Sequence, residues 1–228
     1  MARLAAREGI AAIAATPHVG RNFSTTAAQM ERGVADLNRD FAQQGLPVTV
    51  LHGGEVDLER LPSLTEEDVR CFSLAQTGRY LLVETPLSGW PLYLHRRVFE
   101  LRSKNVTPVL AHPERSREVQ RNPGILDAAV GTGALVQLTA ASLEGRFGRR
   151  VKHASNRLLE LGLVHVLASD AHTPAIRAAG LSRAIAALRD DGLARYLTQD
   201  VPAAIVAVED IPNDAPRRRG RRRRFLLG

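Results

Sequence analysis

The sequence predicts an α/β fold whose strands run parallel. Short apolar runs rich in Val, Leu, Ile and Ala alternate with stretches of helical periodicity, as in repeated strand–helix units. The runs are nearly continuous rather than alternately apolar and polar, which is typical of strands buried on both faces. Histidines and carboxylates follow these runs, at the ends where parallel α/β barrels carry their active sites.

Six strands are expected, at residues 9–16, 48–53, 80–85, 107–111, 134–139 and 164–169. Helical patterns lie between and after them, at residues 25–44, 91–104, 123–131, 147–161, 174–189 and 202–208. Ser24 or Thr25 is a suitable N-cap for the first of these helices, and Gly45 and Gly162 are suitable ends for helices. Residues 1–10 have helical character, and residues 58–71 form a looser connection with an acidic cluster.

The composition indicates an ordinary globular protein. The 228 residues suffice for one domain, and hydrophobic residues make up 44% against 24% charged ones. A single cysteine, Cys71, cannot form an internal disulfide, which favours a reducing compartment. No apolar run approaches the ~20 residues of a membrane span, and no signal-peptide pattern opens the chain. We therefore expect a cytoplasmic protein without a transmembrane segment.

The net charge of +7 comes from the C-terminal end. Residues 217–224 contain seven arginines, and without them 24 basic residues face 24 acidic ones. Composition shifts near residue 212, so we expect a domain at residues 1–212 and a disordered Arg-rich tail at 213–228. Such a tail is usually solvated, although contact with a polyanion is an alternative.

Polar residues at the predicted strand ends indicate a metal site. Two glutamates, one aspartate and three histidines would share one mouth of the fold, and they would repel or desolvate badly there without a cation. Mixed nitrogen and oxygen ligands favour Mn, Zn or Fe. The candidate ligands are His18, Glu55, Glu84, His112, Asp170 and His172.

Two arginines indicate an anionic substrate at the same mouth. Arg115 comes three residues after His112, and Arg177 seven after Asp170. A guanidinium group suits bidentate recognition of phosphate.

The remaining histidines and the cysteine do not fit this pattern. His165 falls inside the last strand and should be packed, whereas His95 and His153 lie on helical stretches and should be solvated. His52 is interpreted as structural. Cys71 lacks the phosphate-cradling Cys-x5-Arg loop, so a cysteine-based phosphatase is not expected.

The motifs ATPH, GGEV, LLVETP, VLAHPER, SLEGRFG and ASDAH stand in this order along the chain. In order and approximate spacing the sequence resembles the PHP-domain (polymerase and histidinol phosphatase) protein-tyrosine phosphatases of bacterial capsular and exopolysaccharide synthesis. The resemblance covers about residues 1–212. It implies a distorted (β/α)7 barrel with a trinuclear metal cluster, usually of manganese, with Fe, Zn or Mg as alternatives. It also implies hydrolysis of phosphotyrosine on the tail of a cognate tyrosine autokinase.

Matched residue by residue, the resemblance implies roles for eight side chains. Arg115 and Arg177 would bind phosphate and act in catalysis, and Glu84 would be a further ligand or a proton-transfer group. The implied metal ligands are His18, Glu55, His112, Asp170 and His172.

One part of the family pattern is absent. An Asp-x-His-x-His strand and an Asp-Asp-Gly turn open the family's sequences, whereas Met1 lies in what resembles the first helix. We therefore expect a barrel without its first strand, with a start assigned too late as the simplest reason. Three other functions stay open: a phosphoesterase of a small metabolite such as histidinol phosphate, a catalytically impaired binding module, and a polyanion-binding protein.

Overall fold

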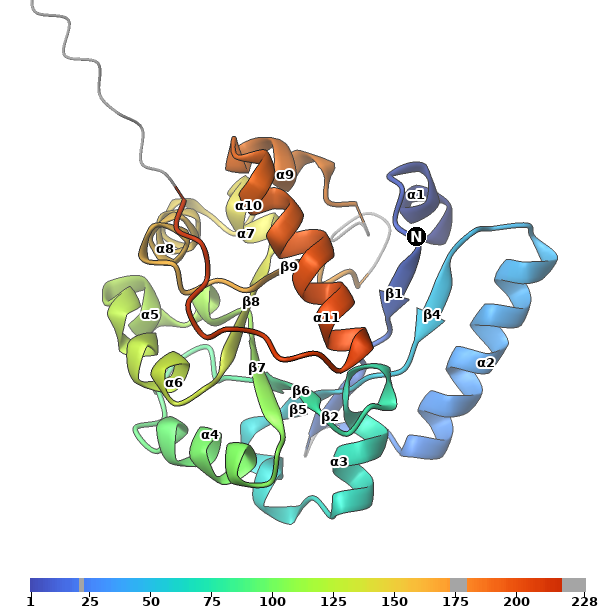
Figure 1. Cartoon of the computed structure of the whole chain (residues 1–228), viewed down its shortest axis with the longest axis horizontal. Helices are drawn as coiled ribbons and strands as arrows, with labels where there is room; N and C mark the ends of the chain where they lie inside the picture. Colours follow the sequence, from blue (N-terminus) through green and yellow to red (C-terminus); the bar gives the residue numbers. More distant parts are fainter. Residues whose placement is uncertain (21–22, 173–179, 219–228) are drawn as a thin grey trace, which may run out of the picture.

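The structure is a computed structural model that describes residues 1–20, 23–172 and 180–218. A seven-stranded sheet has the strand order β3-β2-β5-β6-β7-β8-β9, and β1 and β4 form a separate two-stranded sheet (Figure 1). All neighbouring pairs from β2 to β9 are parallel, as is the β1–β4 pair, and β3 is antiparallel to β2. The predicted mixed α/β fold with parallel sheets is therefore confirmed.

The strands are short. Their bounds are β1 Ala12–Ala14, β2 His18–Gly20, β3 Phe23–Ser24, β4 Thr49–Leu51, β5 Glu55–Asp57, β6 Tyr80–Glu84, β7 Thr107–Ala111, β8 Leu135–Thr139 and β9 Val166–Ala168. The α-helices are α1 Ala2–Arg7, α2 Ala27–Gln43, α3 Glu66–Phe72, α4 Leu94–Ser103, α5 Arg117–Arg121, α6 Asp127–Gly131, α7 Ala140–Glu144, α8 Arg149–Leu161, α9 Ser182–Leu188, α10 Asp191–Arg195 and α11 Val201–Ala207. The 3-10 helices are η1 Leu58–Ser63, η2 Leu74–Gln76, η3 Pro113–Arg115 and η4 Pro123–Leu126, and η5 Tyr196–Asp200 is a π-helix.

The middle of the large sheet agrees best with the sequence prediction. The strand expected at residues 107–111 has those bounds, and the strands expected at 80–85, 134–139 and 164–169 are shorter by one to three residues. Leu110, Val136, Leu138 and Leu167 are almost completely buried in one core cluster. Continuous apolar runs were a reliable signal here because helices and loops cover both faces of these strands.

The strands expected at residues 9–16 and 48–53 are present but shorter, as β1 and β4, and they pair with each other outside the large sheet. The prediction missed β2 and β5, which follow them along the chain and join the large sheet. Pro17 separates β1 from β2, since proline has no N–H to donate to a ladder. Gly53 and Gly54 separate β4 from β5, and an added Cβ would lie 3.1 Å from Thr16 and from Val19, respectively.

Several helices also differ from expectation. The first long helix is capped by Thr26, in a capping box with Gln29, and not by Ser24 or Thr25. The stretch expected to be loose contains α3, which Thr65 and Asp68 cap in the same way. Part of the helix expected at 174–189 lies outside the described residues, and α9 begins at Ser182.

Residues 213–218 pack against the body of the fold and do not resemble a solvated tail. Ala215 is buried, and the Asn213 carbonyl lies 2.9 Å from Nε2 of His165. Arg218 donates to the carbonyls of Leu188 and Ala187. The packed chain thus extends past the expected boundary at residue 212, and the rest of the Arg-rich segment, residues 219–228, lies outside the described residues.

Three of the four histidines expected to play no part in the site lie as predicted. His165 is completely buried, and His95 and His153 are exposed on α4 and α8. Over the described residues, no helix combines the length and apolar character needed to cross a bilayer.

We expect His165 to make the stability of this fold depend on pH. The Val136 N–H donates to its Nδ1 at 3.1 Å, so Nδ1 carries no proton, and Nε2–H donates to the Asn213 carbonyl. Burial lowers the pKa of His165. Below about pH 6.5 the unfolded chain takes up a proton that the folded chain excludes, so stability is lost as pH falls, by up to about 1.4 kcal/mol per pH unit.

We expect His165→Gln to be less stable than wild type at pH 7.5 but to lose less stability on going to pH 5.5. Thermal unfolding of both proteins at the two pH values measures this. Parallel pH profiles would show that His165 is not the group responsible.

Candidate metal centre

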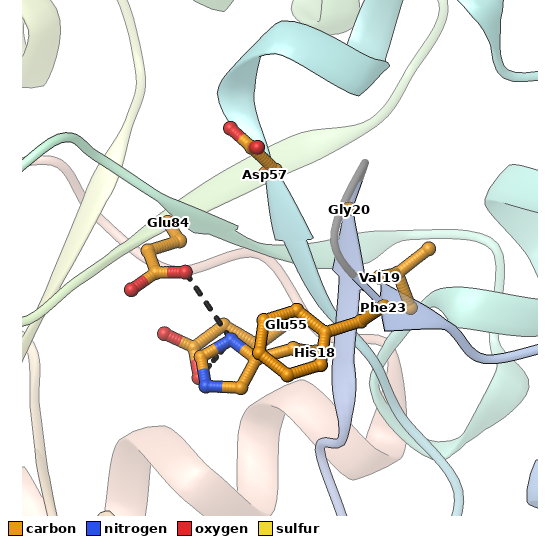
Figure 2. Close-up of a pocket in the computed structure, with 7 residues that line it drawn as sticks. All are labelled: His18, Val19, Gly20, Phe23, Glu55, Asp57 and Glu84. Atoms are coloured by element: carbon orange, nitrogen blue, oxygen red, sulfur yellow. Dashed lines mark ion pairs between the residues drawn. The ribbon is translucent and has the colours of Figure 1, made fainter.

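Four of the predicted ligands lie on neighbouring strands of the large sheet. His18 and Glu55 open β2 and β5 and are paired in register. Glu84 ends β6, opposite Ala111 of β7, and His112 follows β7 directly. Because neighbouring strands are about 4.8 Å apart, this register brings the four side chains together. Figure 2 shows His18, Glu55 and Glu84 directed toward one another.

The distances within this cluster are short. Nδ1 of His18 lies 3.2 Å from Oε2 of Glu84 and 3.9 Å from Oε2 of Glu55. Nε2 of His112 lies 2.8 Å from Oε1 of Glu55 and 3.8 Å from Oε1 of Glu84. His112 and Glu55 are buried, whereas His18 and Glu84 are part-exposed at the mouth. Two imidazoles and two carboxylates therefore meet within reach of one small ion.

The two carboxylates affect each other's charge. Burial alone would raise the pKa of Glu55, but the hydrogen bond and positive charge of His112, with His18 and His172, hold that pKa below its usual value. Burial, together with the negative charge of Glu55, raises the pKa of Glu84. Burial opposes protonation of His112, yet the hydrogen bond to Glu55 raises its pKa. A cation at the centre would relieve the repulsion between the glutamates.

The donor set fits a divalent transition metal. One ligand atom from each of His18, Glu55 and Glu84 lies within 4.8 Å of the others. His112 adds a nitrogen on the buried side, and among the described residues no group bonds its other nitrogen, Nδ1. A set of nitrogen and carboxylate ligands suits Mn, Fe or Zn, whereas a set made only of oxygen ligands is typical of Mg and Ca.

Asp170 and His172 form a second group beside the cluster. Oδ2 of Asp170 lies 3.6 Å from a guanidinium nitrogen of Arg115 and 3.5 Å from the hydroxyl of Thr139. Nδ1 of His172 lies 3.5 Å from Oδ1 of Asp170, and its ring centroid is 6.0 Å from that of His18.

The backbone between β9 and His172 is not extended at Asp170. Asp170 has φ of 48°, in the left-handed region that aspartate tolerates better than most residues.

A chain of polar contacts connects the two groups. The backbone N–H of His112 donates to Oε1 of Gln137 at 3.2 Å, and Nε2 of Gln137 donates to the Thr139 hydroxyl at 3.4 Å. That hydroxyl in turn faces Asp170. β8 thus links the end of β7 to Asp170, two residues after the end of β9.

The chain matches the family described as capsular polysaccharide synthesis, CpsB/CapC, over residues 1–203. The chain belongs to the CpsB/CapC family.

Individual relatives agree with this assignment. The tyrosine-protein phosphatase YwqE of Bacillus subtilis (strain 168) is 40% identical over 176 residues, which are 75% of this chain and 68% of YwqE. The tyrosine-protein phosphatase CpsB of Streptococcus pneumoniae is 24% identical over 174 residues, 73% of this chain and 70% of CpsB. The chain thus spans about two thirds of the length of these relatives.

A solved structure of the family superposes closely. It is one of the crystal structures of YwqE from Bacillus subtilis and CpsB from Streptococcus pneumoniae, which are described as unique metal-dependent tyrosine phosphatases. The TM-score is 0.84 at 33% sequence identity, and the match covers 97% of this chain and 90% of the other.

In this CpsB/CapC chain the two predicted phosphate-binding arginines have different outcomes. Arg115 lies at the site, with its guanidinium carbon 5.2 Å from the ring centroid of Phe147 and its nitrogen near Asp170. Arg177 lies outside the described residues.

Sequence reasoning missed two aromatic residues at this CpsB/CapC site. Phe23 is 53% exposed and stacks on the imidazole of His18 with 4.8 Å between ring centroids (Figure 2). It lines a small cavity of about 140 Å³ together with His18, Glu55 and Glu84. Phe147 supports Arg115. The sequence carries only a weak signal for these two residues, because it is the fold that brings their rings next to the polar residues of the site.

Cys71 takes no part in this arrangement. It is a buried free thiol whose pKa is raised by burial and by its hydrogen bond to Glu67, so it is a poor nucleophile.

Proposed function

We propose that this chain is a metal-dependent protein-tyrosine phosphatase that hydrolyses phosphotyrosine on the tail of a cognate bacterial tyrosine autokinase controlling capsular or exopolysaccharide synthesis. The observation that carries the proposal is the cluster of His18, Glu55, Glu84 and His112 with Arg115 nearby. The relatives named tyrosine-protein phosphatases support the same activity. The cytoplasm, where the kinase tail would be phosphorylated, is the proposed location.

The proposed ligands are His18, Glu55, Glu84, His112, Asp170 and His172, and manganese is the proposed metal, in the trinuclear cluster that the family resemblance implies. Bound divalent ions would supply Lewis acidity toward the phosphoryl group and toward water. Glu84 is the proposed ligand or proton-transfer group, and its part-exposed position at the mouth supports this role.

Arg115 and Arg177 are the proposed phosphate-binding pair. A guanidinium group can donate two parallel hydrogen bonds to a phosphoryl group and offset the charge that grows on its oxygens. The Phe147 ring beneath Arg115 limits the directions that its guanidinium can take.

Phe23 favours an aryl phosphate ester over a small aliphatic phosphate as the substrate. Its exposed ring at the cavity offers a flat apolar surface for the phenol of phosphotyrosine.

The finer interpretation of the fold, a distorted (β/α)7 PHP barrel without its first strand, is also proposed. It is supported by the run of parallel pairs from β2 to β9 and by the unpaired edge of β9 among the described strands.

Metal removal tests the proposed function. We expect prolonged dialysis against EDTA to abolish hydrolysis of a phosphotyrosine peptide, and Mn²⁺ to restore it better than Mg²⁺. Histidinol phosphate, assayed alongside, should be a far poorer substrate. Activity that survives complete metal removal would refute the metal-dependent mechanism, and preferential hydrolysis of histidinol phosphate would replace the proposed substrate.

A further inference from the structure

A second cavity of about 610 Å³ lies between α5 and the start of α8, outside the metal centre. It is lined by Arg117, Gln120, Arg121 and Arg150. The three arginines are exposed, and no ion pair to any of them is recorded within the described residues. The lining residues concentrate positive charge in a chain whose body is otherwise close to neutral.

The carboxylate nearest in sequence offsets only part of this charge, because the single negative charge of Glu118 acts on Arg121 while three arginines line the pocket. Glu118 is the acidic residue of α5, and its oxygens accept from the Gly89 N–H at 3.2 Å and the Ser116 hydroxyl at 3.0 Å. The first turn of α8 has no acidic residue, and a cation there is disfavoured by the helix dipole. Helix stability therefore does not explain why Arg150 stands at this position.

Residues on both sides of the pocket lie close to Arg115, the arginine at the metal centre. Arg115 and Arg117 lie two residues apart, so their Cα atoms are at most about 7 Å apart. Nε2 of Gln120 donates to the carbonyls of Glu114 and Arg115, at 3.3 and 3.1 Å. On the other wall, Phe147 contacts the Arg115 guanidinium and stands three residues before Arg150.

We propose that this arginine pocket is a second anion site, which binds an acidic or phosphorylated side chain flanking the target phosphotyrosine of the same peptide. The inference rests on the proposed function. Guanidinium groups recognise carboxylate and phosphate with the same fork of donors. The volume of about 610 Å³ leaves room for a side chain together with the peptide backbone next to it.

A substrate panel tests the inference. Peptides of one length would carry a phosphotyrosine with neutral neighbours, with glutamates nearby, or with a second phosphotyrosine, and p-nitrophenyl phosphate would serve as the small substrate. The variant Arg121→Ala/Arg150→Ala would be compared with Arg32→Ala/Lys104→Ala. The control removes the same charge from exposed positions of α2 and of the end of α4.

We expect wild type to favour the acidic and doubly phosphorylated peptides through a lower KM. The pocket variant should raise KM for these two by about 5- to 30-fold with kcat unchanged, because two exposed charge contacts are lost. The neutral peptide and p-nitrophenyl phosphate should change less than about 2-fold, and the control variant should behave as wild type. If wild type has a lower KM only for the doubly phosphorylated peptide, the pocket binds phosphate and not carboxylate.

Equal KM values for all three peptides in wild type, or equal effects of the pocket and control variants, would overturn the inference. Direct binding of the same peptides, measured by fluorescence anisotropy, separates this failure from that of the proposed function. If no substrate is hydrolysed, a loss of affinity for acidic peptides in the pocket variant alone still supports the pocket, and unchanged affinity refutes it.

Discussion

Glu55→Gln is expected to deplete the bound metal and to lower phosphotyrosine turnover by at least about 100-fold, since even partners outside the ligand set carry a cost of about 10- to 100-fold. Glu55 is 4% exposed and lies at the centre of the cluster, 2.8 Å from His112 and 3.9 Å from His18. An amide keeps the shape of the side chain but removes the negative charge that attracts a cation. One substitution therefore separates charge from packing.

Metal content by elemental analysis and turnover of a phosphotyrosine peptide measure the effect. Glu59→Gln is the matched control, because it makes the same change at an exposed position four residues later. Circular dichroism of both variants shows whether the fold is intact. A folded Glu55→Gln protein with full metal content and wild-type turnover would exclude Glu55 as a ligand.

Arg115→Ala is expected to lower kcat by about 10²–10³ while metal content stays at the wild-type level. The guanidinium group lies beside Asp170 and over Phe147, next to the cluster but not among its ligand atoms. Its proposed role is to stabilise charge that develops on the phosphoryl oxygens, which an alanine cannot do. Arg115→Lys keeps the charge but loses the planar fork, so we expect intermediate turnover.

Single-turnover kinetics and metal analysis of the two Arg115 variants distinguish this role from a structural one. If the role were purely structural, both variants would lose thermal stability, and kcat would not fall in the order wild type, Arg115→Lys, Arg115→Ala. Near-wild-type turnover of Arg115→Ala would show that Arg115 is not a phosphate-binding residue.

The site could be predicted from the sequence where a strand end and a polar residue coincide. Glu84 and His112 directly follow long apolar runs, so their convergence required only the assumption of parallel strands. His18 and Glu55 were predicted as candidates on the same assumption. Their true setting, on the short strands β2 and β5, depends on breaks at Pro17 and at Gly53 and Gly54.

The sequence by itself determined the fold class, because runs of apolar residues long enough for strands can be buried only between layers of helix and loop. It also determined which residue types stand at the strand ends, and hence the prediction of a metal site with nitrogen and oxygen ligands. These properties are local: each can be recognised within a few neighbouring residues.

Only the tertiary structure decided which side chains meet. The register between β2, β5, β6 and β7 sets the distances in the cluster, and Phe23 reaches His18 only because β3 turns back along β2. The arginine pocket joins α5 to α8, whose facing residues are nearly thirty positions apart. Such contacts depend on packing between distant segments, and no local pattern of residues encodes the distance between them.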